Sequence, residues 1–134
     1  MSNPYFRFKQ FTVWHDRCAM KVGTDGVLIG AWCDVDACRR ILDVGCGTGL
    51  ISLMIAQRTP DRTMIEGVEI DAVAAEQAAE NTDRSPWKNR LRIHTSDFLD
   101  FATSTTVRYD HIVSNPPYFE KSLLPEDVAR LTAR

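Results

Sequence analysis

The stretch Arg40-Ile41-Leu42-Asp43-Val44-Gly45-Cys46-Gly47-Thr48-Gly49-Leu50 decides the fold of this chain. A short apolar run ends in three alternate glycines, and residues 50–58 follow with apolar side chains at helical spacing. This order predicts a strand over 40–44, a tight turn and a helix over 50–58. Glycines in such a turn let a ligand approach the backbone closely, which makes Gly45, Gly47 and Gly49 candidate cofactor-binding residues.

The spacing of these glycines distinguishes between cofactors. A dinucleotide-binding turn needs its third glycine one position later, where this chain has Leu50. That turn holds a pyrophosphate at a helix N-terminus, whereas S-adenosylmethionine has no phosphate and carries a sulfonium. The spacing therefore favours S-adenosylmethionine and argues against a nicotinamide dehydrogenase.

Strands and helices alternate through the rest of the chain. We expect a strand over 64–70, a helix over 72–81 capped by Asp71, a break at 85–89, a strand over 91–95, a turn of helix over 98–101 and a strand over 109–114. This alternation implies right-handed crossovers and a Rossmann-like α/β fold with helices on both faces of a parallel sheet. Ligands bind such sheets at the carboxyl ends of the strands.

The segment before residue 40 has a different character. Residues 5–14 are rich in aromatic side chains and fit an extended or hairpin lead-in with one buried side, and Thr24 or Asp25 could cap a short helix over 27–32. We therefore divide the chain into a lead-in, 1–39, and the first part of a cofactor-binding domain, 40–134. Four cations lie in residues 1–24 against one acid: Arg7, Lys9, Arg17 and Lys21 against Asp16.

Composition sets outer limits on function. The 134 residues are 44% hydrophobic and 25% charged, with a net charge of −2, which is typical of a soluble domain and gives no protein-wide basic field. No apolar run reaches the ~18 residues of a membrane span, and no secretory signal begins the chain, so we expect a cytoplasmic protein that contacts no membrane. The four cysteines lack metal-ligand spacing, so we expect reduced thiols and no metal.

Three acids follow or end the predicted strands. Asp43, Glu69 and Asp97 would lie at the mouth of the pocket, where carboxylates suit a cationic ligand rich in hydrogen-bond donors. Glu69 could accept both ribose hydroxyls, Asp97 the adenine amino group, and Asp43 the methionine ammonium directly or through water. Helix capping or exposed charge at a strand end would explain these acids equally simply.

Asn115-Pro116-Pro117-Tyr118 is the most specific motif in the chain. The prolines fix φ and remove two donors, so backbone carbonyls and the Asn115 oxygen remain as acceptors that can hold one planar NH2 group. Orienting both N–H bonds aims the nitrogen lone pair for in-line methyl transfer. The Tyr118 ring offers a stacking face for a base rotated out of its helix. A rigid proline turn is the structural alternative.

With these motifs the chain resembles class I S-adenosylmethionine-dependent methyltransferases, and among them the bacterial tRNA1(Val) (adenine-37-N6)-methyltransferases. The resemblance also includes residues 8–11, 15–26 and 85–87. It implies that Thr24 and Asp25 lie against the methionine end of the cofactor, with Glu69 on ribose and Asp97, beside Phe98, on adenine. It further implies that Asn115 and Tyr118 handle an adenine in the anticodon region of tRNA.

Other readings of the same loop stay open. Glutamine-N5 methylation of a release factor, adenine-N6 methylation of DNA and guanine-N2 methylation of ribosomal RNA all use planar amines, and a non-catalytic RNA-binding module could keep the fold. Members of the family resembled run about a hundred residues further, so we expect an N-terminal fragment of doubtful activity. Its fourth strand would expose a sheet edge that invites self-association.

Overall fold

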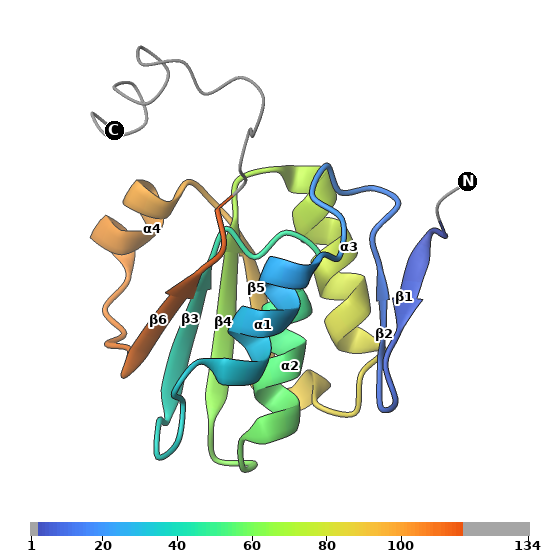
Figure 1. Cartoon of the computed structure of the whole chain (residues 1–134). Helices are drawn as coiled ribbons and strands as arrows, with labels where there is room; N and C mark the ends of the chain where they lie inside the picture. Colours follow the sequence, from blue (N-terminus) through green and yellow to red (C-terminus); the bar gives the residue numbers. More distant parts are fainter. Residues whose placement is uncertain (1–2, 117–134) are drawn as a thin grey trace, which may run out of the picture.

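The computed structural model describes residues 3–116, which form a parallel sheet flanked by helices with a small hairpin beside it (Figure 1). In chain order the elements are β1 (Tyr5–Arg7), β2 (Thr12–Trp14), α1 (Thr24–Trp32), β3 (Arg40–Val44), α2 (Leu50–Arg58), β4 (Met64–Glu69), α3 (Ala72–Asp83), a 3₁₀ turn (Lys88–Arg90), β5 (Leu91–Thr95), α4 (Phe98–Ser104) and β6 (His111–Ser114).

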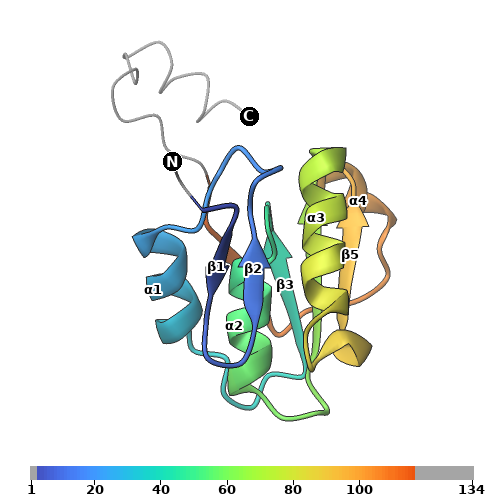
Figure 2. The ribbon, with the colours of Figure 1, turned by 90° about the vertical axis from the view of Figure 1, so that its right-hand side faces the viewer.

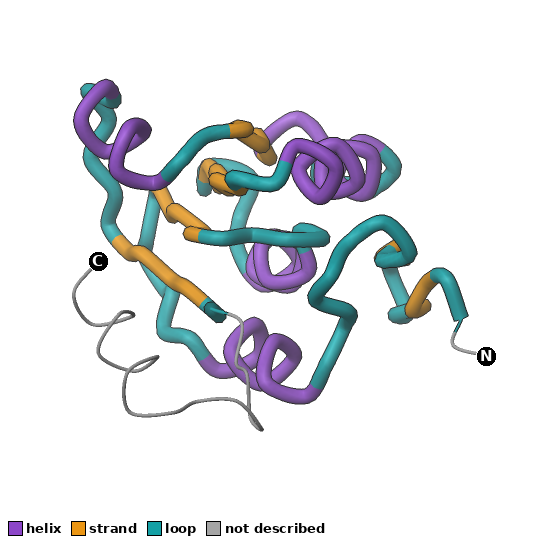
Figure 3. Tube along the Cα trace, turned by 90° about the horizontal axis from the view of Figure 1, so that it is seen from above, coloured by secondary structure: helices purple, strands orange, loops and turns teal. Residues whose placement is uncertain are grey.

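The sheet has the order β5-β4-β3-β6, and each neighbouring pair runs parallel. Seen from above, α1, α2 and α3 lie on one side of the sheet and α4 lies on the other (Figure 3). From β3 the chain first builds the sheet in one direction, through β4 to β5, and then returns to the other side of β3 to add β6. β3, which ends in the glycine turn, is thus the strand at which the order reverses. This is the topological position at which α/β sheets bind ligands.

Each face of the sheet has its own apolar core. Ile41 and Ile65 pack with Ile55 of α2 on one face, while Leu42 and Val68 pack with Phe101 of α4 on the other. Both faces of β3 are buried, which explains the uninterrupted apolar run in the sequence. The predicted α/β class is thus confirmed.

The hairpin β1-β2 is joined to α3 by one buried amide. The Trp14 backbone N–H donates to Asn81 Oδ1 at 3.0 Å, and Asn81 Nδ2 donates to the carbonyl oxygens of Trp14 at 2.9 Å and Thr48 at 2.8 Å. The hairpin lies in front of α2 and beside α3 (Figure 2). Asn81 therefore ties the lead-in to the segment that follows β3.

Most predicted boundaries agree with the structure. The bounds 40–44, 50–58 and 91–95 are confirmed, and Asp71 caps α3 by accepting from the Val73 N–H at 3.1 Å. α3 and α4 run further than predicted, to Asp83 and Ser104, and β4 ends at Glu69. Among the described residues, no helix has both the length and the apolar character needed to cross a membrane.

The predicted first residues of two elements, α1 and β6, are wrong. The first helix begins at Thr24, not Val27, and Gly23 is its N-cap with no side-chain cap bond. Gly23 has the extended backbone that a cap requires, whereas Thr24 is already helical. β6 begins at His111, not Tyr109, and the Asp110 carboxylate before it accepts from the Arg39 and Arg40 backbone N–H groups, at 2.6 Å and 3.0 Å.

Candidate functional site

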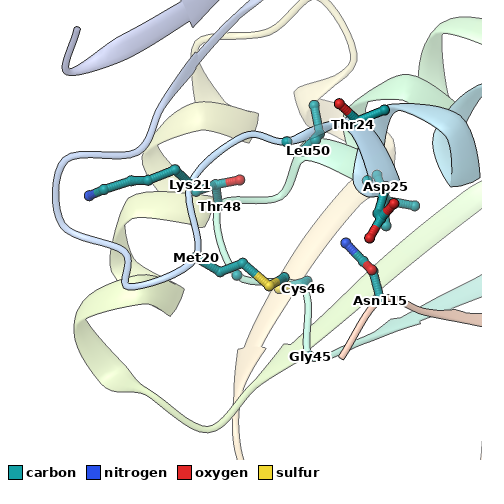
Figure 4. Close-up of a pocket in the computed structure, with 13 residues that line it drawn as sticks. Met20, Lys21, Thr24, Asp25, Gly45, Cys46, Thr48, Leu50 and Asn115 are labelled. Atoms are coloured by element: carbon teal, nitrogen blue, oxygen red, sulfur yellow. The ribbon is translucent and has the colours of Figure 1, made fainter. Parts of the chain in front are cut away.

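A pocket of about 350 Å³ lies at the carboxyl ends of β3 and β6, within the size range of small-molecule sites (Figure 4). Three segments form it: the end of the lead-in with the start of α1, the glycine turn with the start of α2, and the residue that follows β6. Its lining residues are Met20, Lys21, Gly23, Thr24, Asp25, Gly26, Gly45, Cys46, Gly47, Thr48, Leu50, Ile51 and Asn115.

The glycine turn has a backbone that only glycine adopts readily. Gly45, Gly47 and Gly49 all have positive φ, at 68°, 53° and 87°. The Gly45 and Cys46 N–H groups donate to the Val68 carbonyl, at 2.8 Å and 3.0 Å, which fixes the turn against the end of β4. A Cβ on Gly45 would meet no atom within 4 Å, so the space beside this glycine is open to a ligand.

Glu69 holds the glycine turn from the neighbouring strand. Its Oε1 accepts from the Gly47 N–H at 2.8 Å, and its Oε2 accepts from the Asp71 N–H at 3.0 Å. Each oxygen keeps a second lone pair for another donor. Glu69 does not itself line the pocket, but it determines where the pocket's glycine backbone lies.

Asp43 is buried and does not line the pocket, although its position in the sequence predicted a place at the pocket mouth. The residue is 1% exposed, and its Oδ2 accepts from Ser52 Oγ at 2.8 Å. Its Oδ1 is buried and has no hydrogen-bond partner among residues 3–116. Burial raises the pKa of this carboxyl to about 7, although the hydrogen bonds from Ser52 oppose the shift.

The raised pKa of Asp43 predicts a pH dependence of stability. Between the ordinary pKa of 3.8 and about 7, the folded state binds more protons than the unfolded state, so the free energy of unfolding falls as pH rises through this window. We expect a loss on the order of 4 kcal/mol, because the shift spans about 3 pKa units at roughly 1.4 kcal/mol per unit.

Urea unfolding of the chain and of Asp43→Asn between pH 4 and pH 8 measures this dependence. The variant keeps a neutral side chain of the same shape, so its free energy of unfolding should lose this slope. Equal slopes in both proteins would contradict the assignment to Asp43.

Asn115 reaches the pocket from the end of β6, and in Figure 4 its side chain and that of Asp25 point toward one another. Its Oδ1 is buried and, like Asp43 Oδ1, accepts no hydrogen bond from the described part of the chain. A Cβ on Gly26 would stand 3.4 Å from Asn115 Nδ2 and 3.0 Å from Leu50 Cδ2. Gly26 therefore lets α1 approach both groups closely.

His15 organises the loop between β2 and α1, which supplies Met20 and Lys21 to the pocket. The buried ring accepts the Val22 N–H on Nδ1 at 3.0 Å, so its Nε2 donates to the Asn3 carbonyl at 2.9 Å. Lys21 Nζ donates to the His15 carbonyl at 2.6 Å. One ring thus connects both ends of this loop.

We expect His15→Ala to lower the free energy of unfolding by about 2 kcal/mol, because the partly buried Val22 N–H would lose its acceptor and the buried ring would leave a void. His111→Ala is the matched control, since the His111 side chain makes no hydrogen bond within residues 3–116 and its loss should change stability by less than ~0.5 kcal/mol. Thermal and urea unfolding of both variants measure the difference. Equal losses would show that His15 has no special role.

The structure brings together only some of the predicted site residues. Thr24, Asp25, Gly45, Gly47 and Asn115 line the pocket. The others do not line it: Asp43, Gly49, Glu69, Asp97, Phe98 and Pro116. Asp97 caps α4 by accepting from the Leu99 N–H at 2.7 Å, as the simpler interpretation expected. Pro117 and Tyr118 lie outside the described residues.

Several pocket residues were not predicted as site residues. Met20 and Lys21 come from an irregular loop with no periodic pattern, while Cys46 and Thr48 stand between the glycines that were predicted. All four cysteines are free thiols, and residues 3–116 bring no three His, Cys, Asp or Glu side chains together at a possible metal site.

The fold and the glycine-turn pocket define a methyltransferase-like α/β domain. The structure superposes on a putative O-methyltransferase from Klebsiella pneumoniae with a TM-score of 0.62, at 22% identity over 73% of this chain and 46% of the other. The O-methyltransferase TomG from Streptomyces achromogenes, solved in complex with SAM, gives a TM-score of 0.60, at 22% identity over 72% and 45%. The chain belongs to the methyltransferase small domain family, which matches residues 24–131.

The sequence is also similar to curated proteins over its whole length. It is 57% identical over 134 residues to the tRNA1(Val) (adenine(37)-N6)-methyltransferase of Bacteroides thetaiotaomicron, which covers 100% of this chain and 56% of that protein. The chain therefore spans a little over half the length of this relative. The resemblance to the methyltransferase family, drawn from the motifs, is confirmed.

Proposed function

We propose that this chain contributes the S-adenosylmethionine site and the amine-binding loop of an N-methyltransferase, whose substrate is N6 of adenine-37 in tRNA1(Val). The observation that carries this proposal is a single pocket shared by the glycine turn, the start of α1 and Asn115. The name of the relative from Bacteroides thetaiotaomicron supports the choice of tRNA as the substrate.

The residues present fit S-adenosylmethionine, which supplies an electrophilic methyl group on a sulfonium. The open space beside Gly45 accommodates a ligand against the backbone, and the buried, unpartnered Oδ1 of Asp43 is an acceptor for the methionine ammonium or a water bound to it. Thr24 and Asp25 lie at the same pocket and would face the methionine end. Asp25 in the pocket lining and Glu69, which holds the Gly47 backbone, supply carboxylates that suit a cation.

The ribose and adenine contacts involve acids outside the pocket lining. Glu69 keeps one lone pair on each oxygen after holding Gly47 and Asp71, so it can still accept from ribose hydroxyls. Asp97 uses Oδ1 for its cap bond to Leu99, which leaves Oδ2 for the adenine amino group, with Phe98 beside it. A carboxylate held by backbone N–H groups is oriented before the ligand arrives.

Asn115 would hold the amine of the substrate. Its buried Oδ1 lacks a donor among the described residues, and Pro116 has no N–H to compete for acceptors. An amine N–H bonded to Oδ1 turns the nitrogen lone pair toward the methyl donor, and the spare proton leaves to a carbonyl or to water. The roles of Pro117 and Tyr118 in binding the base remain predictions.

A methyl-transfer assay with radiolabelled S-adenosylmethionine tests the substrate. Unmodified tRNA1(Val), total ribosomal RNA, DNA and a release factor compete in one reaction, and the label is followed on each. We expect it on tRNA1(Val), at the N6 of one adenine. Label on the release factor alone would replace tRNA by a glutamine substrate, and absence of cofactor binding by calorimetry would favour a non-catalytic RNA-binding module.

A further inference from the structure

A second hollow lies away from the cofactor pocket, between the hairpin and the C-terminal half of α3. It is open, measures about 790 Å³, and includes in its lining Tyr5, Arg7, Lys9, Thr12, Trp14 and Arg84. We call this surface the hairpin hollow. The proposed transfer reaction uses none of these residues.

The register of the hairpin explains why one of its faces is hollow. Tyr5 pairs with Trp14 and Arg7 pairs with Thr12, so these four side chains share one face of β1-β2. Val13 points the other way and is fully buried in the core with Leu53. The hairpin thus uses one face for folding, while the other face lines the hollow. Figure 2 shows β1 and β2 beside α3.

The hairpin hollow is cationic. Three of its lining residues carry positive charge and none carries negative charge. Arg7 and Lys9 form no ion pair within residues 3–116, and Arg84 has only a long contact of 3.8 Å with Glu80. The chain as a whole is slightly acidic, so this local excess is a specific feature rather than the general charge of the surface.

Aromatic rings stand among these cations. Tyr5 and Trp14 contact each other with ring centroids 4.9 Å apart, and Tyr5 remains 39% exposed. Rings with a free face and an unpaired arginine and lysine nearby match the chemistry of single-stranded nucleic acid, whose bases stack on aromatics while its phosphates contact cations. An acidic protein would use the cations and leave the exposed ring without a partner.

We propose that the hairpin hollow binds single-stranded RNA next to the methylated nucleotide, with Arg7 and Lys9 on phosphates and Tyr5 under a base. This inference rests on the proposed tRNA substrate and deepens it. β2 continues through the loop that His15 organises to the cofactor pocket, so one short segment of chain connects the two surfaces. Tyr5 and Trp14 pair at the end of the hairpin from which the chain continues to the pocket, so an RNA that places one adenine at Asn115 would extend along the hairpin to reach Arg7 and Lys9.

The test measures binding of an unmodified tRNA1(Val) transcript to the chain by fluorescence anisotropy, from 50 to 200 mM salt. Arg7→Glu with Lys9→Glu is compared with Arg62→Glu and Arg108→Glu, which make the same charge change at exposed positions outside the hollow. We expect the hollow variant to bind at least about tenfold more weakly and to lose roughly 1.4 to 1.8 from its log–log salt slope, while the control keeps the slope of the parent.

A second pair of variants tests the stacking contact. Tyr5→Ala should weaken binding of the transcript roughly tenfold at unchanged salt slope, whereas Tyr5→Phe, which keeps the ring, should bind as the parent does. Circular dichroism melting of all variants verifies that the hairpin is folded.

Two outcomes overturn the inference: equal binding by the hollow and control variants, or a parent chain that binds no RNA. The proposed methyl transfer fails separately. If the RNA binds through the hollow but no adenine is methylated, the hollow stands and the activity does not. If tRNA is methylated but the hollow and control variants bind it equally, the proposed activity is supported and RNA binding by the hairpin hollow is wrong.

Discussion

Replacing Asn115 with alanine is expected to lower the proposed methyl transfer to tRNA by about 10²- to 10³-fold, the usual cost of removing one preorganised polar group from a transition state. Asn115 Oδ1 is buried and unpartnered in the described part of the chain, so it is free to accept from the amine. Alanine removes that acceptor and leaves the glycine turn intact. Single-turnover assays with saturating cofactor measure the loss.

Two comparisons make the Asn115 result specific. S-adenosylhomocysteine should bind the alanine variant within about threefold of the parent by calorimetry, because the ligand's other contacts remain. Asn115→Asp keeps an acceptor oxygen at this position and should retain more activity than Asn115→Ala. If cofactor affinity falls as much as activity, Asn115 belongs to the cofactor site and not to the amine site.

Glu69→Ala is expected to weaken S-adenosylhomocysteine binding by at least about 100-fold. The change removes the acceptor of the Gly47 and Asp71 N–H groups and the proposed partner of the ribose, and each lost charge-assisted bond costs about 1.5 to 3 kcal/mol. Glu76→Ala is the control, since the Glu76 carboxylate makes only a 3.3 Å contact with Arg17 at the surface. Its effect on affinity should stay below about twofold.

Glu69 has two proposed roles that an experiment can separate: it holds the Gly47 backbone, and it contacts the ribose of the cofactor. A 2′-deoxyribose analogue of S-adenosylhomocysteine should bind the parent more weakly than S-adenosylhomocysteine does. If Glu69 contacts the ribose, Glu69→Ala should bind the analogue and S-adenosylhomocysteine with equal affinity. If the discrimination persists in the variant, Glu69 acts only by holding Gly47. Unchanged affinity for both ligands would contradict both roles.

Local sequence predicted the elements that carry the cofactor turn. Residues 40–58 gave strand, turn and helix at the observed bounds because glycine spacing, an apolar run and helical periodicity all act between near neighbours. Asp71 was predicted as a cap for the same reason, since its partner Val73 is two residues away. The start of α1 was missed because a cap depends on backbone conformation, and Gly23 has no side chain that signals it.

The α/β class, the glycine turn and the position of Asn115 after a strand all follow from patterns within short segments of the chain. Packing between distant segments buries Asp43, places Glu69 against Gly47 and leaves one face of the hairpin open beside α3. Burial and hydrogen bonding of these side chains depend on residues far apart in the chain, so they arise only when strands and helices pack. No periodicity within one segment can report them.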